Sequence, residues 1–154
     1  MRPQSPELLL EAFAEALQTM AFMFPEPLAD DVPLPTAADC LSITWSGGGT
    51  GQLQLATSRG FGELLACTIL AMDPGAAEAA QHSVDALQEL CNITTGTLLV
   101  RLCDSPDDAP EMGLPTATIL PDAAAWQSFV AQPHTIVLMA EGFPLAIRMQ
   151  EAQL

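Results

Sequence analysis

The chain has 154 residues, of which 49% are hydrophobic and 15% charged, with nineteen acidic residues, four arginines and no lysine. This length and composition can bury a packed core, so we expect one folded domain over residues 1–154. The net charge of −15 disfavours binding to nucleic acid or anionic membranes, because both require Lys or Arg side chains that neutralise phosphates, and a partner that presents a cation is favoured.

The first third of the chain predicts a helix, a loop and a hairpin. Ser5 suits a helix N-cap and Pro6 the first helical position, and apolar residues follow at helical spacing. Four prolines within 25–35 then predict an extended loop. Two alternating segments, 40–45 and 51–58, flank a glycine-rich turn and predict a β-hairpin.

The rest of the chain, from residue 61 onwards, predicts both helices and strands. Residues 61–72 are apolar on nearly all sides, which fits either a buried helix or a buried strand. Asp73 and Pro74 suit the N-cap and first position of a long helix that runs to about Thr95 or further. The last elements expected are a strand at 114–120, a short helix at 121–132 and a second hairpin over 135–150 that turns at Glu141-Gly142.

This order of elements predicts an α+β fold, with two long helices packed on one face of a mostly antiparallel sheet. Each half has a helix followed by strands, so the chain reads as a loose duplication. The start is acidic and amphipathic, and no uncharged apolar run reaches about 20 residues, so we expect a cytoplasmic protein without a membrane span. The four cysteines are widely spaced, which favours buried reduced thiols over a disulfide or zinc site.

The long helix carries an unusual set of polar residues in VDALQELCNITTG, residues 84–96. At 100° per residue, Asp85, Glu89, Asn92 and Gly96 lie within about 60° of one another, and Asn92 is the only asparagine in the chain. Taken alone, this stripe fits the solvated face of an ordinary amphipathic helix. Gly96 could be a C-cap, or it could clear room for a partner.

A second feature extends the pattern, because Pro115 follows Asn92 after twenty-two intervening residues. The spacing Asp85-x3-Glu89-x2-Asn92-x22-Pro115 resembles the signature of the CheC/CheX/FliY phosphatases of bacterial chemotaxis. A single signature in a chain of this length is most similar to CheX.

The resemblance implies an enzyme that hydrolyses the phospho-aspartate of a CheY-like response regulator in two-component signalling. By this resemblance, Asn92 would orient the attacking water and Glu89 would contact the active-site lysine of the regulator. Asp85 and Gly96 would belong to the docking surface, and Pro115 would shape the start of a strand near the helix. The resemblance implies no cofactor of the chain's own, since the regulator holds the Mg²⁺, and it favours a homodimer through the last hairpin or another exposed sheet edge.

These residue types suit that chemistry. Positioning and electrostatics dominate phosphoryl transfer, so little covalent participation is needed. The carboxamide of Asn92 can donate to a phosphoryl oxygen and accept from a water without repelling the phosphoryl group. The carboxylate of Glu89, one turn away, can pair with a lysine ammonium.

Other interpretations remain open at this stage. The first helix places Glu11, Glu15 and Gln18 at the corresponding spacing, but position 41 is Leu rather than Pro, so we expect that helix to be structural. The protein could instead be a non-catalytic CheC-like or flagellar-switch-type adaptor that binds a response regulator. The motif could also be coincidental, and its polar residues would then be buried or face different directions.

Overall fold

The computed structural model describes residues 5–151 as an α+β structure with one antiparallel sheet. The helices are α1 (Pro6–Ala21), α2 (Phe61–Ile69), α3 (Ala77–Gln81), α4 (Ser83–Leu102) and α5 (Ala123–Val130), with a 3₁₀ turn η1 (Pro106–Asp108). The strands are β1 (Glu26–Pro27), β2 (Ala38–Ser46), β3 (Gly51–Ser58), β4 (Glu111–Met112), β5 (Thr116–Leu120), β6 (Ile136–Ala140) and β7 (Phe143–Glu151).

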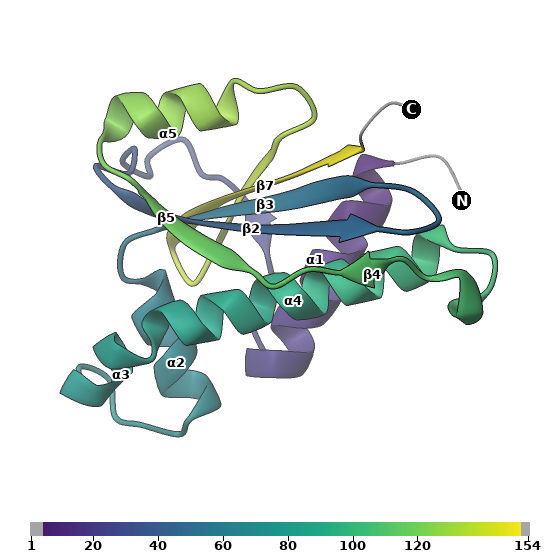
Figure 1. Ribbon diagram of the computed structural model, residues 1–154. Helices are drawn as coiled ribbons and strands as arrows, with labels where there is room; N and C mark the ends of the chain where they lie inside the picture. Colours follow the sequence, from purple (N-terminus) through teal and green to yellow (C-terminus); the bar gives the residue numbers. More distant parts are fainter. Residues whose placement is uncertain (1–4, 152–154) are drawn as a thin grey trace.

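The sheet has the order β1-β6-β7-β3-β2-β4, and β5 pairs with β2 alongside β4. Both predicted hairpins are present as β2–β3 and β6–β7. Helices α1, α2 and α4 lie on one side of the sheet, and α5 lies on the other (Figure 1). The predicted fold class, with two long helices on one face of a mostly antiparallel sheet, is therefore confirmed.

The core lies mainly between the sheet and the helices α1, α2 and α4. Phe13 and Leu17 of α1 and Leu87 and Leu90 of α4 are fully buried there against strand residues such as Leu55. A smaller cluster on the opposite face packs Trp126 and Phe129 of α5 against small residues of the strands. Packing on both faces explains why successive residues are buried in the middle of the sheet, as from Leu55 to Ser58 in β3 and from Pro144 to Ile147 in β7.

Local sequence explains how α1 begins and ends. The Ser5 side chain accepts a hydrogen bond from the backbone N–H of Leu8 at 3.1 Å, and Pro6 occupies the first turn, as predicted. The helix ends at Phe22, whose φ of 54° is left-handed and whose backbone N–H closes the last turn on Gln18.

Several element predictions are settled or corrected by the structure. Residues 61–69 are the helix α2 rather than a strand. The prediction of one helix starting at Asp73-Pro74 is wrong, because Gly75 has a φ of 83°, which a right-handed helix cannot contain, and α3 starts only at Ala77. The helical stretch is then divided at His82, and α4 continues to Leu102. The two-residue strands β1 and β4 were not predicted.

The fully buried ring of Phe13 provides a test of this core. Phe13→Ala should lower the free energy of unfolding by about 3–5 kcal/mol, because it removes apolar contacts and leaves a cavity. Urea denaturation monitored by circular dichroism measures the change. Phe24, which is 60% exposed, is the matched control, and Phe24→Ala should change stability by less than about 0.5 kcal/mol. Equal effects of the two substitutions would contradict the packing described here.

Candidate functional site

Helix α4 is buried over most of its circumference. It packs against α1, α2 and the strands β2 and β3, and nine of its residues are buried. Two of these, Thr94 and Thr95, satisfy their hydroxyls by donating to the carbonyls of Leu90 and Cys91, at 2.7 and 2.8 Å. The solvent-facing strip of α4 is therefore narrower than the wet face of an ordinary surface helix.

The three polar residues of the predicted signature lie on this strip. Asp85 and Glu89 are exposed, and Asn92 is half-buried. The opposite side of the helix faces the core, with Ala86, Leu87, Leu90, Cys91 and Leu98 buried and Ile93 half-buried. The polar residues are neither buried in the core nor directed to different sides, so the arrangement expected of a coincidental motif is not seen.

Within residues 5–151, the Glu89 carboxylate and the Asn92 carboxamide make no hydrogen bond or ion pair with another residue. Asp85, by contrast, has a neighbour, because its Oδ2 lies 3.9 Å from Nδ1 of His82. Both of these groups are largely exposed, so the pair contributes little to stability. Glu89 and Asn92 are thus available for contacts with another molecule.

Pro115 lies beside α4, directly before strand β5, as the sequence predicted for the start of a strand. The side chain of Gln88 donates from Nε2 to the carbonyl oxygen of Pro115 at 3.2 Å. Gln88 immediately precedes Glu89, so this hydrogen bond joins the two separated parts of the sequence signature. The structure brings Asp85, Glu89, Asn92 and Pro115 to one region of the molecule.

Gly96 is an interior residue of α4 and not its C-cap, since the helix continues for six more residues and is capped at Cys103. The side chain of Met112 lies next to it, and a methyl group at position 96 would stand 3.9 Å from the Sδ and Cε atoms of Met112. This is an ordinary van der Waals separation. The small size of Gly96 is therefore not required for packing within the chain.

The thiol next to Asn92 does not add a nucleophile to the site. Cys91 is fully buried, and this burial, together with the nearby Cys40, raises the pKa of the Cys91 thiol to about 12. The thiol is neutral at physiological pH and unsuited to nucleophilic attack. All four cysteines are buried and free of disulfides, so the predicted buried thiols are confirmed.

The corresponding residues of the first helix are engaged within the chain. Arg101 of α4 donates to Glu11 of α1 through Nη1 at 2.9 Å, and its Nη2 donates to Glu15. One guanidinium therefore holds both carboxylates and ties α1 to the C-terminal half of α4. Gln18, one turn further along α1, is exposed.

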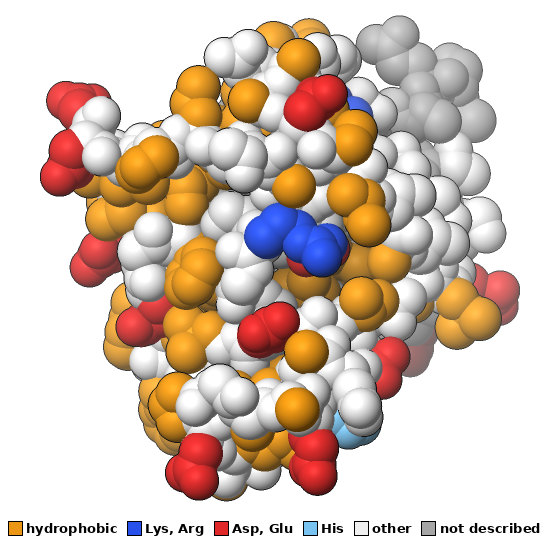
Figure 2. Space-filling view, turned by 90° about the vertical axis from the view of Figure 1, so that its left-hand side faces the viewer, with side chains coloured by type: hydrophobic (Ala, Val, Ile, Leu, Met, Phe, Trp, Pro, Cys, Tyr) orange, Lys and Arg blue, Asp and Glu red, His pale blue; other side chains and the backbone are white. Residues whose placement is uncertain are grey.

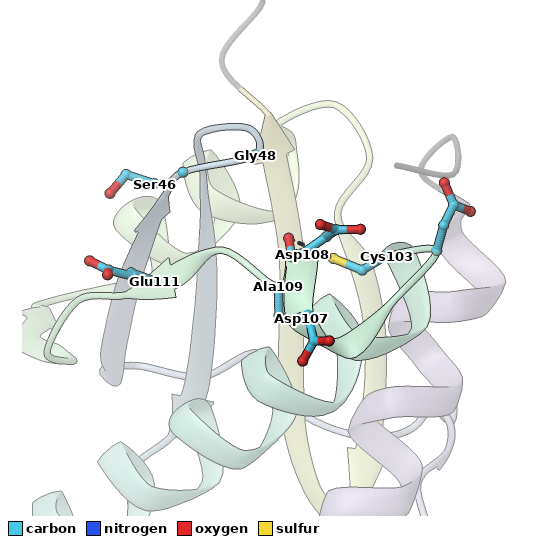
Figure 3. A pocket seen from close by; sticks show the side chains of 9 residues that line it. Ser46, Gly48, Cys103, Asp107, Asp108, Ala109 and Glu111 are labelled. Atoms are coloured by element: carbon cyan, nitrogen blue, oxygen red, sulfur yellow. Dashed lines mark hydrogen bonds between the residues drawn. The ribbon is translucent and has the colours of Figure 1, made fainter.

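A hollow lies away from the signature residues, at the C-terminal end of α4. It has a volume of about 730 Å³ and lies between the β2–β3 turn and the segment that connects α4 to β4 (Figure 3). Acidic side chains border it, from Asp104, Asp107, Asp108 and Glu111. In residues 5–151, no group of three or more Cys, His, Asp or Glu side chains is arranged to hold a metal ion.

Acidic side chains are spread over the surface. In Figure 2 they lie scattered among exposed apolar side chains, with a basic patch near the centre of that face. The arginines in the described part of the chain are held by neighbours: Arg59 by Asp39, Arg101 by two glutamates, and Arg148 by Gln54 with its guanidinium over the Phe129 ring. No helix within residues 5–151 has the length and apolar character needed to span a bilayer.

Comparison with known proteins identifies the fold. No protein-family profile and no curated protein matches the chain. CheX from Desulfovibrio desulfuricans superposes with a TM-score of 0.67 at 13% identity, over 95% of this chain and 97% of that one. The CheX–CheY–BeF3–Mg²⁺ complex from Borrelia burgdorferi gives a TM-score of 0.63 at 12% identity, over 99% and 100%. FliY from Thermotoga maritima gives 0.60 at 12% identity, over 96% and 87%.

The chain thus has the α+β fold of the CheX, CheC-like and FliY proteins. The resemblance drawn from the spacing of Asp85, Glu89, Asn92 and Pro115 is confirmed for the fold, with CheX structures among the most similar. Sequence identities of 12–13% carry the fold only.

Two residues of the site, Gln88 and Met112, were not predicted from the sequence. Gln88 lies between the signature positions, and Met112 lies on a strand of only two residues. Gln88 has a recognisable signal in retrospect, because it is four residues before Asn92 and eight before Gly96 and so shares their row on the helix. Met112 has no such signal, since its position depends on pairing with β2.

Gly96 offers a direct test of the packing beside Asn92. Gly96→Ala should raise the free energy of unfolding by about 0.5–1 kcal/mol, because alanine favours the helix and its methyl group fits beside Met112. Thermal and urea unfolding measure the change. Gly62→Ala is the control, because a methyl group there would stand 2.9 Å from Leu87 and 3.1 Å from a backbone oxygen, so it should destabilise. A destabilised Gly96→Ala variant would contradict this description.

Proposed function

We propose that residues 1–154 act as one CheX-like phosphatase domain that hydrolyses the phospho-aspartate of a CheY-like response regulator. The observation that carries the proposal is the placement of Glu89 and Asn92 on the narrow free strip of α4, beside Pro115 and without partners in the described chain. The similarity of the fold to the CheX–CheY–BeF3–Mg²⁺ complex supports the choice of partner.

Asn92 would act on the water that attacks the phosphoryl group. Its carboxamide can accept a hydrogen bond from the water and donate one to a phosphoryl oxygen, which fixes the water in line with the phosphorus–oxygen bond. Half-burial of Asn92 on a helix packed on several sides restricts its rotamers and so favours this single geometry. No covalent intermediate on this chain is needed, in keeping with the neutral Cys91 thiol.

Glu89 would fix the position of the regulator relative to α4. Its exposed carboxylate can pair with a lysine ammonium at the active site of the regulator, one helical turn from Asn92. The Mg²⁺ would belong to the regulator, and its charge together with that lysine would offset repulsion between the phosphoryl group and the acidic surface of this chain. Asp85, further along the strip, would contribute to docking rather than to chemistry.

The assembly that best fits the surface is a homodimer through the edge of β5. This edge has no strand partner among residues 5–151, and four of its five residues are exposed, including Ile119 at 59%. Residues 116–121, which form this edge, carry no charge, in a chain with a net charge of −15. Two copies can approach here with the least repulsion and can satisfy the free backbone groups of both edges.

The phosphatase proposal predicts that removal of the Asn92 carboxamide greatly lowers the rate of phosphate loss. Wild-type protein should accelerate phosphate loss from a phosphorylated cognate regulator in Mg²⁺, and Asn92→Ala should reduce this acceleration by about 10²-fold or more without loss of stability. Phosphate release and thermal unfolding measure the two effects. The matched control is Gln18→Ala, which removes an exposed amide from α1 and should leave the rate unchanged.

Two results would contradict this assignment. If the wild-type protein accelerates phosphate loss from none of the regulators produced by the same cell, it is not a phosphatase of this class. If it binds the regulator without turnover, and Asn92→Ala binds equally well, then the non-catalytic adaptor is the correct function. A loss of activity in Gln18→Ala would place a second site on α1.

The dimer proposal predicts that a charge on the β5 edge separates the subunits. Ile119→Asp should give a monomer at concentrations where the wild-type protein is a dimer, because like charges would then meet across the edge. Sedimentation velocity measures the change. Ile69→Asp, at an exposed isoleucine of α2, is the control and should remain dimeric. A wild-type protein that is monomeric throughout would overturn this assembly.

A further inference from the structure

The segment from β4 to β5, which pairs with β2, contains one residue more than regular strand pairing requires. Trp45 pairs with Met112 in β4, and Ser42 pairs with Thr116 in β5. Three steps along β2 therefore face four steps along the neighbouring chain, so residues 113–115 form a bulge between β4 and β5. Bulges of this kind redirect a side chain away from the regular alternation of the sheet.

The bulge is held firmly on both sides. The backbone N–H of Gly113 donates to the carbonyl of Thr44 on β2 at 2.7 Å, and Gln88 of α4 donates to the carbonyl of Pro115. Pro115 also fixes its own backbone φ and has no N–H to leave unsatisfied. Between these two attachments the side chain of Leu114 is 88% exposed, the largest exposed fraction of any large hydrophobic residue in the described chain.

The bulge runs along the row of α4 that contains Asn92. Gln88, Asn92 and Gly96 are spaced four residues apart and so follow one line on the helix surface. Gln88, at one end of this row, contacts Pro115, and Gly96, at the other end, lies next to Met112. The row spans about 12 Å at 1.5 Å per residue, and three extended residues span about 10 Å, so the two segments match in length.

Asn92 is the middle residue of that row and therefore faces residues 113–114 of the bulge. Its half-burial agrees with this position, whereas Glu89, on the next row, is exposed. A partner that reaches Asn92 would therefore lie next to the bulge that carries Leu114. The exposed leucine is thus part of the rim of the proposed site and not an isolated surface residue.

We propose that Leu114 is a docking residue, which inserts into an apolar depression on the response regulator next to its phosphorylated aspartate. This inference rests on the proposed function and adds to it the chemistry of the partner surface: a lysine opposite Glu89 and, on the other side of Asn92, apolar side chains opposite Leu114. A second copy of this chain fits less well, because the carboxylates of Asp85 and Glu89 would be brought close to their own equivalents or to other acidic groups.

Leu114 would supply binding affinity and not catalysis, so its effect should appear in KM. Leu114→Ala should raise the KM for the phosphorylated regulator about tenfold and leave kcat within about twofold of wild type, since uniform binding is lost while the chemistry is retained. Leu114→Asp should raise KM further, because it places a charge against an apolar surface. Leu34→Ala, at a 53% exposed leucine in the loop before β2, is the control and should change neither constant.

The outcomes separate the two proposals. A wild-type protein without activity on any regulator would overturn both. An active wild-type protein in which Asn92→Ala loses kcat, but Leu114→Ala and Leu114→Asp keep the wild-type KM, would overturn the docking role alone. Leu114→Asp that dissociates a dimer in sedimentation velocity while KM is unchanged would assign the residue to contacts between copies instead. Thermal unfolding of each variant checks that the leucine substitutions act on binding and not on folding.

Discussion

Burial of helix α4 against α1, α2 and the sheet is the packing on which the rest of the molecule depends. It fixes the helix in rotation as well as in position, because buried residues recur on several sides of it and not on a single face. The remaining strip is narrow, and a few polar residues on it acquire defined directions. A helix lying loosely on a sheet could carry the same sequence without holding a carboxylate and a carboxamide in a fixed relation.

Three kinds of chemistry meet on this strip. The carboxylates of Asp85 and Glu89 lie in water, the carboxamide of Asn92 is half-buried, and the bulge beside it exposes an apolar leucine. The carboxylates would recognise positive charge on a partner, the carboxamide would recognise a group that exchanges hydrogen bonds, and the leucine would recognise apolar surface. Recognition that needs all three together is more selective than recognition by the acidic surface as a whole.

Much of this arrangement could be predicted from the sequence, because it follows from local rules. The start of α1 depends on Ser5 and Pro6, both hairpins follow from alternation and turn residues, and the common direction of Asp85, Glu89 and Asn92 follows from helical spacing. The spacing to Pro115 predicted which family of folds to expect.

Other features depend on contacts between distant segments and could not be predicted. The helical stretch starts only at Ala77, because Gly75 has a left-handed conformation, and it divides at His82. Strand β4 is too short to show alternation, so neither the bulge nor the place of Met112 beside Gly96 had a signal. Arg101 is an ordinary surface arginine by sequence, and only the fold brings it to Glu11 and Glu15.

That arginine has a consequence for stoichiometry. Helices α1 and α4 occupy comparable places in the two halves of the chain, so two equivalent working surfaces could in principle exist. Arg101 removes this equivalence, because a residue of one helix binds both carboxylates of the other. Under the proposed phosphatase function, one subunit would then engage one regulator molecule at a time, and the rate of dephosphorylation would rise in direct proportion to the number of subunits, with no cooperativity within a chain.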